Sequence, residues 1–166
     1  MEGPVLEVGS RYNGRSGNPR ILFSKDTDYV GIDMQEGVGV DVVHDMEQPY
    51  MSDEFQTVIC CSVLEHCARP WLVANNIEAA LRRDGNIFVS APFVWRFHNY
   101  PNDYWRFSTE AFKVLFPQIE WEFLYYIGKK KKEIFSSYFE LSSSAKAHRA
   151  TDATATAMSV GFGRKR

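Results

Sequence analysis

Five short apolar runs limit what this chain can fold into more than any other feature of its sequence. They span residues 5–8, 29–32, 40–43, 57–63 and 86–91. Each run is shorter than a typical buried helix, and its residues are almost continuously apolar rather than alternating with polar ones. Strands of this kind are covered on both faces, as they are in parallel sheets. The runs therefore predict an α/β fold with a mostly parallel sheet.

Two helices are predicted in the second half of the chain. The first begins with Pro70 in its first turn and ends at "RRDG", residues 82–85. Its apolar face carries Val73, Ile77, Ala80 and Leu81. The second, "TEAFKVLF", follows Ser108 as a capping residue and is closed by Pro117. The first of these helices would form the crossover between two parallel strands.

The first half of the chain leaves little room for helices. About two turns fit near residues 19–24, and residues 34–39 are too few for a crossover helix. One face of the sheet is therefore expected to be thinly covered. Two final strands, at 119–127 and 157–162, are expected to form a hairpin, and the Ser-, Ala- and Thr-rich residues 129–156 between them read as an insertion or lid.

Composition limits the class of protein. The 166 residues suffice for a single domain, residues 1–166. With 19 Lys and Arg against 21 Asp and Glu, the charge balance favours no nucleic-acid partner. No apolar run approaches the length of a membrane helix and no secretory leader is evident, so we expect a soluble, cytoplasmic protein. Three clustered cysteines predict neither a disulfide framework nor a metal site.

Acidic residues and a glycine follow the first three predicted strands. Glu7 and Gly9 come with the first strand, Asp33 with the second and Asp45 after the third. The carboxyl ends of parallel strands meet at one edge of the sheet, where ligands bind. Gly9 would let a ligand approach the backbone, Asp33 could bind a pair of ribose hydroxyls and Asp45 an adenine amine. Each acid could instead cap the turn that follows it.

Taken together, five segments resemble the signature segments of class I S-adenosylmethionine-dependent methyltransferases. They are "VLEVGS", "YVGIDM", "VVHDM", "FQTVICCSVLEHCARPW" and "LRRDGNIFVSAPF", and "ATAMSVGFGRKR" resembles the antiparallel strand that closes the family's sheet. The resemblance implies a doubly wound, Rossmann-like fold with S-adenosylmethionine as cofactor and no metal. It implies a cofactor site made of Glu7, Gly9, Asp33, Met34, Asp45, Met46 and Ser62. Gly9 would border the methionine part, Asp33 the ribose, Asp45 and Met46 the adenine, and Ser62 the pocket floor.

The segment "RFHNYPNDYWRFS", residues 96–108, follows the fifth strand at the edge where an acceptor would enter. It resembles the "HxYPxDYWRF" stretch of a bacterial subset of these methyltransferases, some of them associated with sugar and glycan pathways. The resemblance implies a small-molecule acceptor methylated on oxygen or nitrogen, with a sugar-related compound as one candidate. His98 is the candidate catalytic base because an imidazole titrates near neutral pH. The substrate-side candidates are His66, Tyr100, Asp103, Tyr104, Trp105 and Arg106.

Structural roles are the alternative for several of these residues. Trp105 could be a packing anchor, Asp103 and Arg106 could form a structural ion pair, and His66 could be a hydrogen-bonded turn residue. The loop "EVGSRYNGRSG" departs from the family's acid-x-Gly-x-Gly-x-Gly, because Ser10 and Arg11 follow the first glycine. This departure keeps a second function open.

The second function is that of a methyltransferase-like module that binds a partner without catalysis. A nicotinamide-dependent oxidoreductase would also use a glycine turn and a ribose-binding acid, but residues 9–14 read G-S-R-Y-N-G instead of G-x-G-x-x-G. A homo-oligomer or a partner subunit is expected to cover the thin face of the sheet. The alternative is that residues 129–156 fold back over that face.

Overall fold

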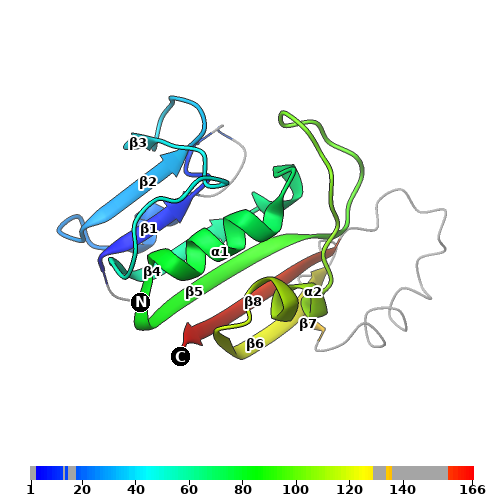
Figure 1. Cartoon of the computed structure of the whole chain (residues 1–166). Helices are drawn as coiled ribbons and strands as arrows, with labels where there is room; N and C mark the ends of the chain where they lie inside the picture. The colour runs from blue at the N-terminus through cyan, green and yellow to red at the C-terminus, as the bar shows by residue number, and fades with distance from the viewer. Residues whose placement is uncertain (1–2, 13, 15–17, 129–133, 136–156) are drawn as a thin grey trace.

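An eight-stranded sheet runs through the described residues of the computed structural model, which are 3–12, 14, 18–128, 134–135 and 157–166. The strands are β1 (Val5–Val8), β2 (Tyr29–Asp33), β3 (Val42–Val43), β4 (Phe55–Cys61), β5 (Leu81–Val94), β6 (Ile119–Gly128), β7 (Ile134–Phe135) and β8 (Ala157–Lys165). Their order across the sheet is β3-β2-β1-β4-β5-β8-β6-β7 (Figure 1). The first five pair in parallel, and β8 enters antiparallel between β5 and β6. The predicted mostly parallel sheet with an antiparallel C-terminal strand is confirmed.

Helices are few in the described part of the chain. The α-helices are α1 (Pro70–Ala80) and α2 (Thr109–Leu115), and the 3-10 helices are η1 (Pro19–Leu22) and η2 (Leu64–His66). The hydroxyl of Ser108 accepts a hydrogen bond from the Ala111 amide at 3.3 Å, so the predicted cap of α2 is confirmed. Both α-helices lie against the same face of the sheet (Figure 1). None of the helices that the structure describes is long and apolar enough to span a membrane.

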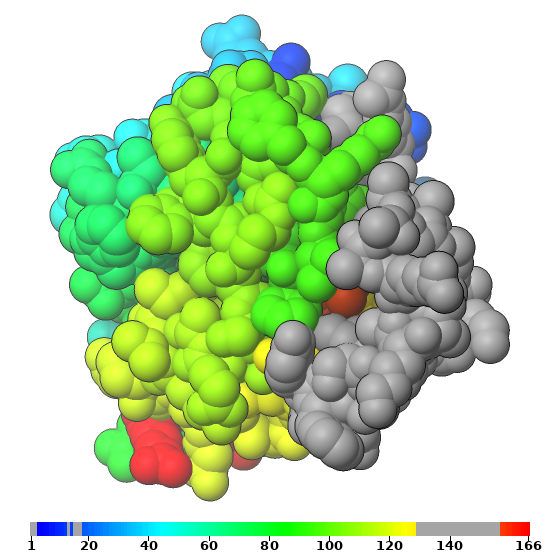
Figure 2. Space-filling view, turned by 90° about the vertical axis from the view of Figure 1, so that its right-hand side faces the viewer, coloured from blue at the N-terminus to red at the C-terminus, as the bar shows by residue number. Residues whose placement is uncertain are grey.

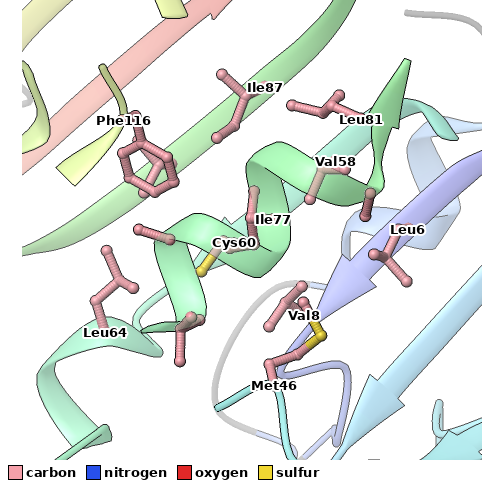
Figure 3. Close-up of a cluster of buried hydrophobic side chains, with 14 of the residues drawn as sticks. Leu6, Val8, Met46, Val58, Cys60, Leu64, Ile77, Leu81, Ile87 and Phe116 are labelled. Atoms are coloured by element: carbon pink, nitrogen blue, oxygen red, sulfur yellow. The ribbon is translucent and has the colours of Figure 1, made fainter. Parts of the chain in front are cut away.

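The hydrophobic core lies between that face and the two α-helices. Alternate residues of β1, β4 and β5 point toward the helices, such as Leu6 and Val8 of β1, as expected from the two-residue period of a strand. Figure 3 shows Ile77 of α1 among side chains from β4 and β5. Ile77 and Phe116 are fully buried. The core thus fixes α1 directly over the strands whose carboxyl ends carry the candidate site.

Several element boundaries differ from the sequence prediction, among them the end of α1 and the start of β3. The first helix ends at Ala80, and Leu81, expected on its apolar face, has a ψ of 133° and begins β5. Leu81 is still fully buried in the same core, so its burial was predicted correctly and its element was not. The third strand contains only Val42 and Val43 rather than residues 40–43, because the Asp41 carboxylate accepts the Gly31 amide at 2.7 Å. A side chain thus takes the place of a backbone ladder bond.

Short loops and ionic contacts accompany β2 in place of α-helices. The Arg20 guanidinium lies 4.6 Å from the centre of the Tyr29 ring and pairs with the Asp41 carboxylate. The helix expected near residues 19–24 is present as the 3-10 helix η1. The interpretation of residues 129–156 as an insertion or lid falls outside the described residues, apart from the two residues of β7.

Candidate functional site

Three strand ends lie side by side at the carboxyl edge of the sheet. The Gly9 amide donates to the carbonyl of Ile32 at 2.8 Å, and the His44 amide donates to the carbonyl of Asp33 at 2.9 Å. These two bonds join the turn after β1, the end of β2 and the segment after β3. Gly9, Asp33 and Asp45 are therefore gathered at one edge of the sheet.

Asp33 and Asp45 each cap the turn that follows them. Asp33 Oδ1 accepts the Gln35 amide at 3.0 Å, and Asp45 Oδ1 accepts the Glu47 amide at 2.9 Å. One oxygen of each carboxylate therefore has the capping role that was the alternative to ligand binding. A carboxylate has a second oxygen that can accept further hydrogen bonds, so capping and ligand binding are compatible here. Met34, next to Asp33, is 64% exposed.

Gly9 has a conformation and an environment that require glycine. Its φ is +76°, and a Cβ on it would lie 2.3 Å from Cγ2 of Val63, in the segment after β4. The neighbouring Ser62 also has a positive φ, of 54°, and its amide donates to the Ser90 carbonyl at 2.9 Å. The positive φ of Ser62 ends β4 before residue 63, the expected end of that strand. The turn after β1 thus packs directly on the turn after β4.

Two predicted cofactor residues point away from this edge. Glu7 is buried and accepts a hydrogen bond from the Tyr29 hydroxyl at 2.8 Å. Burial raises the pKa of Glu7, against the effect of the Tyr29 hydrogen bond. The Met46 side chain lies in the hydrophobic core and its carbonyl accepts Nδ2 of Asn76 at 2.8 Å. If Met46 lies beside adenine, its backbone and not its side chain would therefore make the contact.

The unusual loop after β1 rests on the connection between β2 and β3. Arg11 Nη1 donates to Gln35 Oε1 at 2.9 Å, and the Tyr12 amide donates to the Val38 carbonyl at 2.8 Å. The Ser10 hydroxyl is buried and has no hydrogen-bond partner among the described residues. Two strand-end carboxylates and an unpartnered hydroxyl at one edge fit a ligand with several polar groups, such as the ribose and adenine of a nucleoside.

Residues 95–108 leave the carboxyl end of β5 and form the centre of the face shown in Figure 2. Asp103 organises this segment although its carboxylate is fully buried. It accepts the His98 amide at 2.7 Å and Nη2 of Arg106 at 2.8 Å, and it also pairs with Nη1. The Arg106 hydrogen bonds hold the pKa of Asp103 well below its usual range. The structural ion pair weighed as an alternative for these two residues is present.

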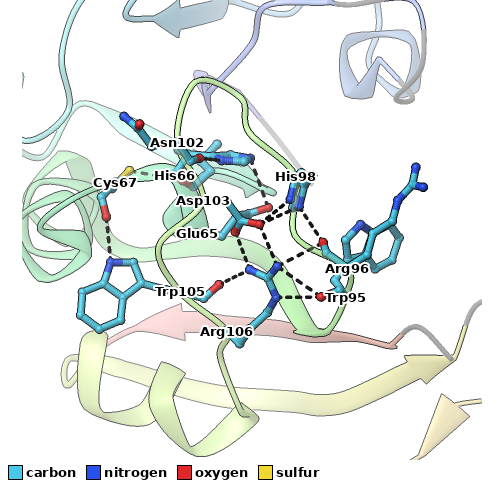
Figure 4. A network of polar contacts seen from close by, with 11 residues as sticks. Glu65, His66, Cys67, Trp95, Arg96, His98, Asn102, Asp103, Trp105 and Arg106 are labelled. Carbon is cyan, nitrogen blue, oxygen red and sulfur yellow. Dashed lines mark hydrogen bonds and ion pairs between the residues drawn. The ribbon is translucent and has the colours of Figure 1, made fainter. Parts of the chain in front are cut away.

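His66 and His98 face each other across this network (Figure 4), with ring centroids 5.0 Å apart. Nδ1 of His66 contacts the Asn102 carbonyl, and Nδ1 of His98 lies 3.2 Å from Asp103 Oδ2. The His98 side chain is 32% exposed. Burial lowers the pKa of His66.

Glu65 is the residue of this site that the sequence analysis did not select. It is fully buried, and its Oε1 lies 3.7 Å from Nε2 of His66. Burial raises the pKa of Glu65 to about 8, although the charge of Arg106 opposes this effect. An acid beside a candidate histidine was the only sequence signal that could have indicated it.

The three aromatic residues among the substrate-side candidates divide into one anchor and two exposed rings. Trp105 Nε1 donates to the Cys67 carbonyl at 2.9 Å, and its ring centroid lies 6.3 Å from that of Trp71. Tyr100 is 49% and Tyr104 51% exposed. Among the aromatic substrate-side candidates, the two tyrosines therefore have the most accessible surface.

The sequence matches no family model and no curated protein. Solved structures nevertheless resemble the fold over nearly the whole chain. An S-adenosylmethionine-dependent methyltransferase of Thermotoga maritima, described as a possible histamine N-methyltransferase, has a TM-score of 0.67 at 18% identity, covering 100% of this chain and 84% of that one. The [4+2]-cyclase SpnF has a TM-score of 0.64 at 15% identity, covering 97% and 73%.

A third similar structure was solved with a product of the cofactor. It is the 1,6-didemethyltoxoflavin-N1-methyltransferase of Burkholderia thailandensis, with S-adenosylhomocysteine and 1,6-didemethyltoxoflavin bound. Its TM-score is 0.51 at 14% identity, covering 97% of this chain and 70% of that one. Strand order, the antiparallel β8 and these similarities agree with one another. The chain therefore has the Rossmann-like fold of class I S-adenosylmethionine-dependent methyltransferases.

Proposed function

We propose that the chain transfers a methyl group from S-adenosylmethionine to oxygen or nitrogen of a small-molecule acceptor, with a sugar-related compound as one candidate. The observation that carries the proposal is the gathering of Gly9, Asp33 and Asp45 at the edge of the sheet where β5 delivers residues 95–108 (Figure 1). Ligands of doubly wound sheets bind at this edge. A cytoplasmic location stays a prediction.

The cofactor side of the proposal rests on the two capping carboxylates. Asp33 would bind the ribose hydroxyls through the oxygen that does not cap Gln35, and Asp45 would accept the adenine amine in the same way. Gly9 and Ser62 would border the methionine part and the pocket floor. When bound, S-adenosylmethionine supplies a methyl group already activated by its sulfonium.

The acceptor side rests on His98. Its Nδ1 lies between two hydrogen-bond acceptors, Asp103 Oδ2 at 3.2 Å and the Arg96 carbonyl at 3.3 Å. Nδ1 of the neutral ring therefore carries the proton and Nε2 keeps its lone pair. Nε2 can take a proton from an acceptor hydroxyl or amine while Asp103 holds the ring in orientation. The exposed Tyr100 and Tyr104 would bind the acceptor beside it.

Calorimetry with S-adenosylmethionine and S-adenosylhomocysteine tests the cofactor assignment. Asp33→Ala should weaken binding about 10- to 100-fold, since charge-assisted hydrogen bonds contribute about 1.5–3 kcal/mol. Asp26→Ala is the matched control, because Asp26 is an exposed acid in the turn before β2, at the opposite edge of the sheet. Equal affinity of Asp33→Ala and the parent protein would show that Asp33 is not a cofactor residue.

A non-catalytic binding module is the second candidate, and one observation favours it. Ser10 and its neighbours replace the family's glycine-rich loop and pack on the β2–β3 connection. Incubation with a metabolite extract and labelled S-adenosylmethionine, followed by mass spectrometry, separates the two candidates. A labelled small molecule identifies the acceptor and supports catalysis, whereas binding without any labelled product supports the module.

We also propose a homo-oligomer or a partner subunit on the sheet face opposite α1 and α2. Among the described residues, no α-helix lies on that face. Phe123 is 48% exposed and its ring stacks with those of Tyr125 and Phe162, at centroid distances of 5.8 and 6.2 Å. Exposed aromatic surface of this kind is often buried by association. Sedimentation at micromolar concentration tests the proposal, and a strictly monomeric protein with no copurifying partner would refute it.

A further inference from the structure

Glu65 is a buried acid whose side chain has no hydrogen-bond partner in another described residue. Its side chain is 1% exposed, and both of its oxygens are unsatisfied among the residues that the structure describes. Buried polar groups are nearly always paired, because a buried polar group without a hydrogen-bond partner is destabilising. The position is held firmly, since the Tyr104 amide donates to the Glu65 carbonyl at 2.8 Å. Within the part of the chain that the structure describes, both oxygens are therefore left available to a ligand.

Two imidazole rings lie beside Glu65. Nδ1 of His66 contacts a backbone carbonyl, that of Asn102, and Nδ1 of His98 faces Asp103 and the Arg96 carbonyl. Carbonyl and carboxylate oxygens accept hydrogen bonds but do not donate them, so each Nδ1 carries the proton. Each neutral ring is then left with a free lone pair on Nε2. Metal-binding histidines are oriented in this way, with the second ring nitrogen donating to a carbonyl or carboxylate.

The spacing of the three groups is close to that of a metal centre. One ligand atom each from Glu65, His66 and His98 lies within 4.8 Å of the others. Oε1 of Glu65 and Nε2 of His66 are 3.7 Å apart. Ligands at about 2.0–2.2 Å from a tetrahedral metal are roughly 3.4 Å from one another. Small side-chain rotations of the partly exposed His98 would therefore bring the set into range.

We propose that Glu65, His66 and His98 form a binding site for a divalent transition-metal ion of the zinc type. Two imidazoles and one carboxylate suit such ions, whereas magnesium and calcium prefer sites made only of oxygen. Three protein ligands leave a coordination position open. If the proposed methyl transfer is correct, that position could hold the acceptor hydroxyl, and His98 would then act as a ligand instead of a base. The metal site itself does not depend on methyl transfer.

Zinc titration of untagged, metal-free protein tests the proposal by calorimetry and by elemental analysis after dialysis. One Zn²⁺ should bind per chain. Glu65→Gln and His98→Gln should each weaken binding at least about 100-fold, because even loss of an outer hydrogen-bond partner costs about 10- to 100-fold. His44→Gln is the matched control, since His44 contacts the Gln48 carbonyl outside the cluster and should leave zinc affinity unchanged.

The outcomes are distinct from those of the cofactor test. Failure of the parent protein to bind Zn²⁺, or equal binding by the parent and both cluster variants, would overturn the metal site and leave the proposed methyl transfer untouched. If circular dichroism shows that the variants are unfolded, the site is tested instead by adding Co²⁺ to the parent protein. Its paramagnetic shifts should then appear on the ring protons of His66 and His98, and shifts confined to other histidines would overturn the assignment.

Discussion

Replacing Gly9 by alanine tests whether the turn after β1 is held by close packing as well as by its backbone conformation. Gly9 and Gly14 have the same φ, +76°, but their surroundings differ. A Cβ on Gly9 would lie 2.3 Å from Val63 Cγ2, whereas no described atom lies within 4 Å of a Cβ on Gly14. Gly14→Ala therefore reports the backbone penalty alone, and Gly9→Ala reports that penalty together with the clash.

The two penalties can be estimated separately. A left-handed backbone costs a residue with a Cβ about 1–2 kcal/mol, which both variants bear. Forcing a methyl group into an occupied space costs about 1–3 kcal/mol, and only Gly9→Ala bears this cost. We expect the free energy of unfolding to fall by about 2–5 kcal/mol in Gly9→Ala and by about 1–2 kcal/mol in Gly14→Ala.

Urea unfolding followed by circular dichroism measures these values. Adding Val63→Ala removes the clashing methyl group, so the double variant should recover most of the difference between the two glycine variants, as a coupling of about 1–3 kcal/mol. Equal destabilisation by Gly9→Ala and Gly14→Ala, or the absence of coupling with Val63→Ala, would refute the packing argument.

Three further changes should follow from packing and charge. Ile77→Ala empties a fully buried position and should cost about 2–5 kcal/mol in urea unfolding, whereas Val114→Ala, at an 80% exposed position of α2, should cost less than about 0.5 kcal/mol. Asp103→Asn leaves the partly buried guanidinium of Arg106 without its counter-charge and should cost about 2–4 kcal/mol in the same assay. A value near zero would contradict a stabilising role of this ion pair. The Arg69 amide and guanidinium lower the pKa of Glu47. Their contacts with the ionised carboxylate therefore stabilise the fold above the ordinary glutamate pKa, and this stabilisation is lost as the pH falls through the lowered pKa of Glu47. Glu47→Gln should therefore be less stable than the parent by about 1 kcal/mol at pH 7, a small value because Arg69 is half exposed. This difference should vanish in acid, and a difference that stays constant with pH would contradict the reasoning.

The sheet and α1 could be predicted because their signals are local. Buried strands and an amphipathic helix show their composition and period within a few residues, and a strand end places its acid at a known edge. Leu81 shows the limit of such signals. An apolar residue at this position fits the buried face of a helix and the buried start of a strand equally well, so periodicity predicted its burial and not the backbone that carries it.

The network around Asp103 depends on contacts distant in sequence. Glu65 is buried because residues 98–106 fold across η2, and nothing within "LEH" distinguishes that acid from one in an exposed turn. The inward direction of Asp103 follows from the guanidinium of Arg106, which also donates to the Trp95 carbonyl at 3.2 Å. The sequence therefore indicated this segment as a candidate, whereas the contacts of its residues required the tertiary structure.

The position of β8 determines the order in which the sheet can be assembled during synthesis. β8 lies between β5 and β6, and its pairs include Asn86 with Arg164 and Tyr125 with Val160. While a growing chain leaves the ribosome, β1 to β5 and α1 can therefore associate early, but β6 has no place beside β5 until β8 has emerged. Pairings between residues so distant in sequence form slowly, so partly assembled sheets expose the β5 edge for longer. Nascent chains stalled before β8 should accordingly be held by chaperones or aggregate, whereas chains stalled after it should resist proteolysis.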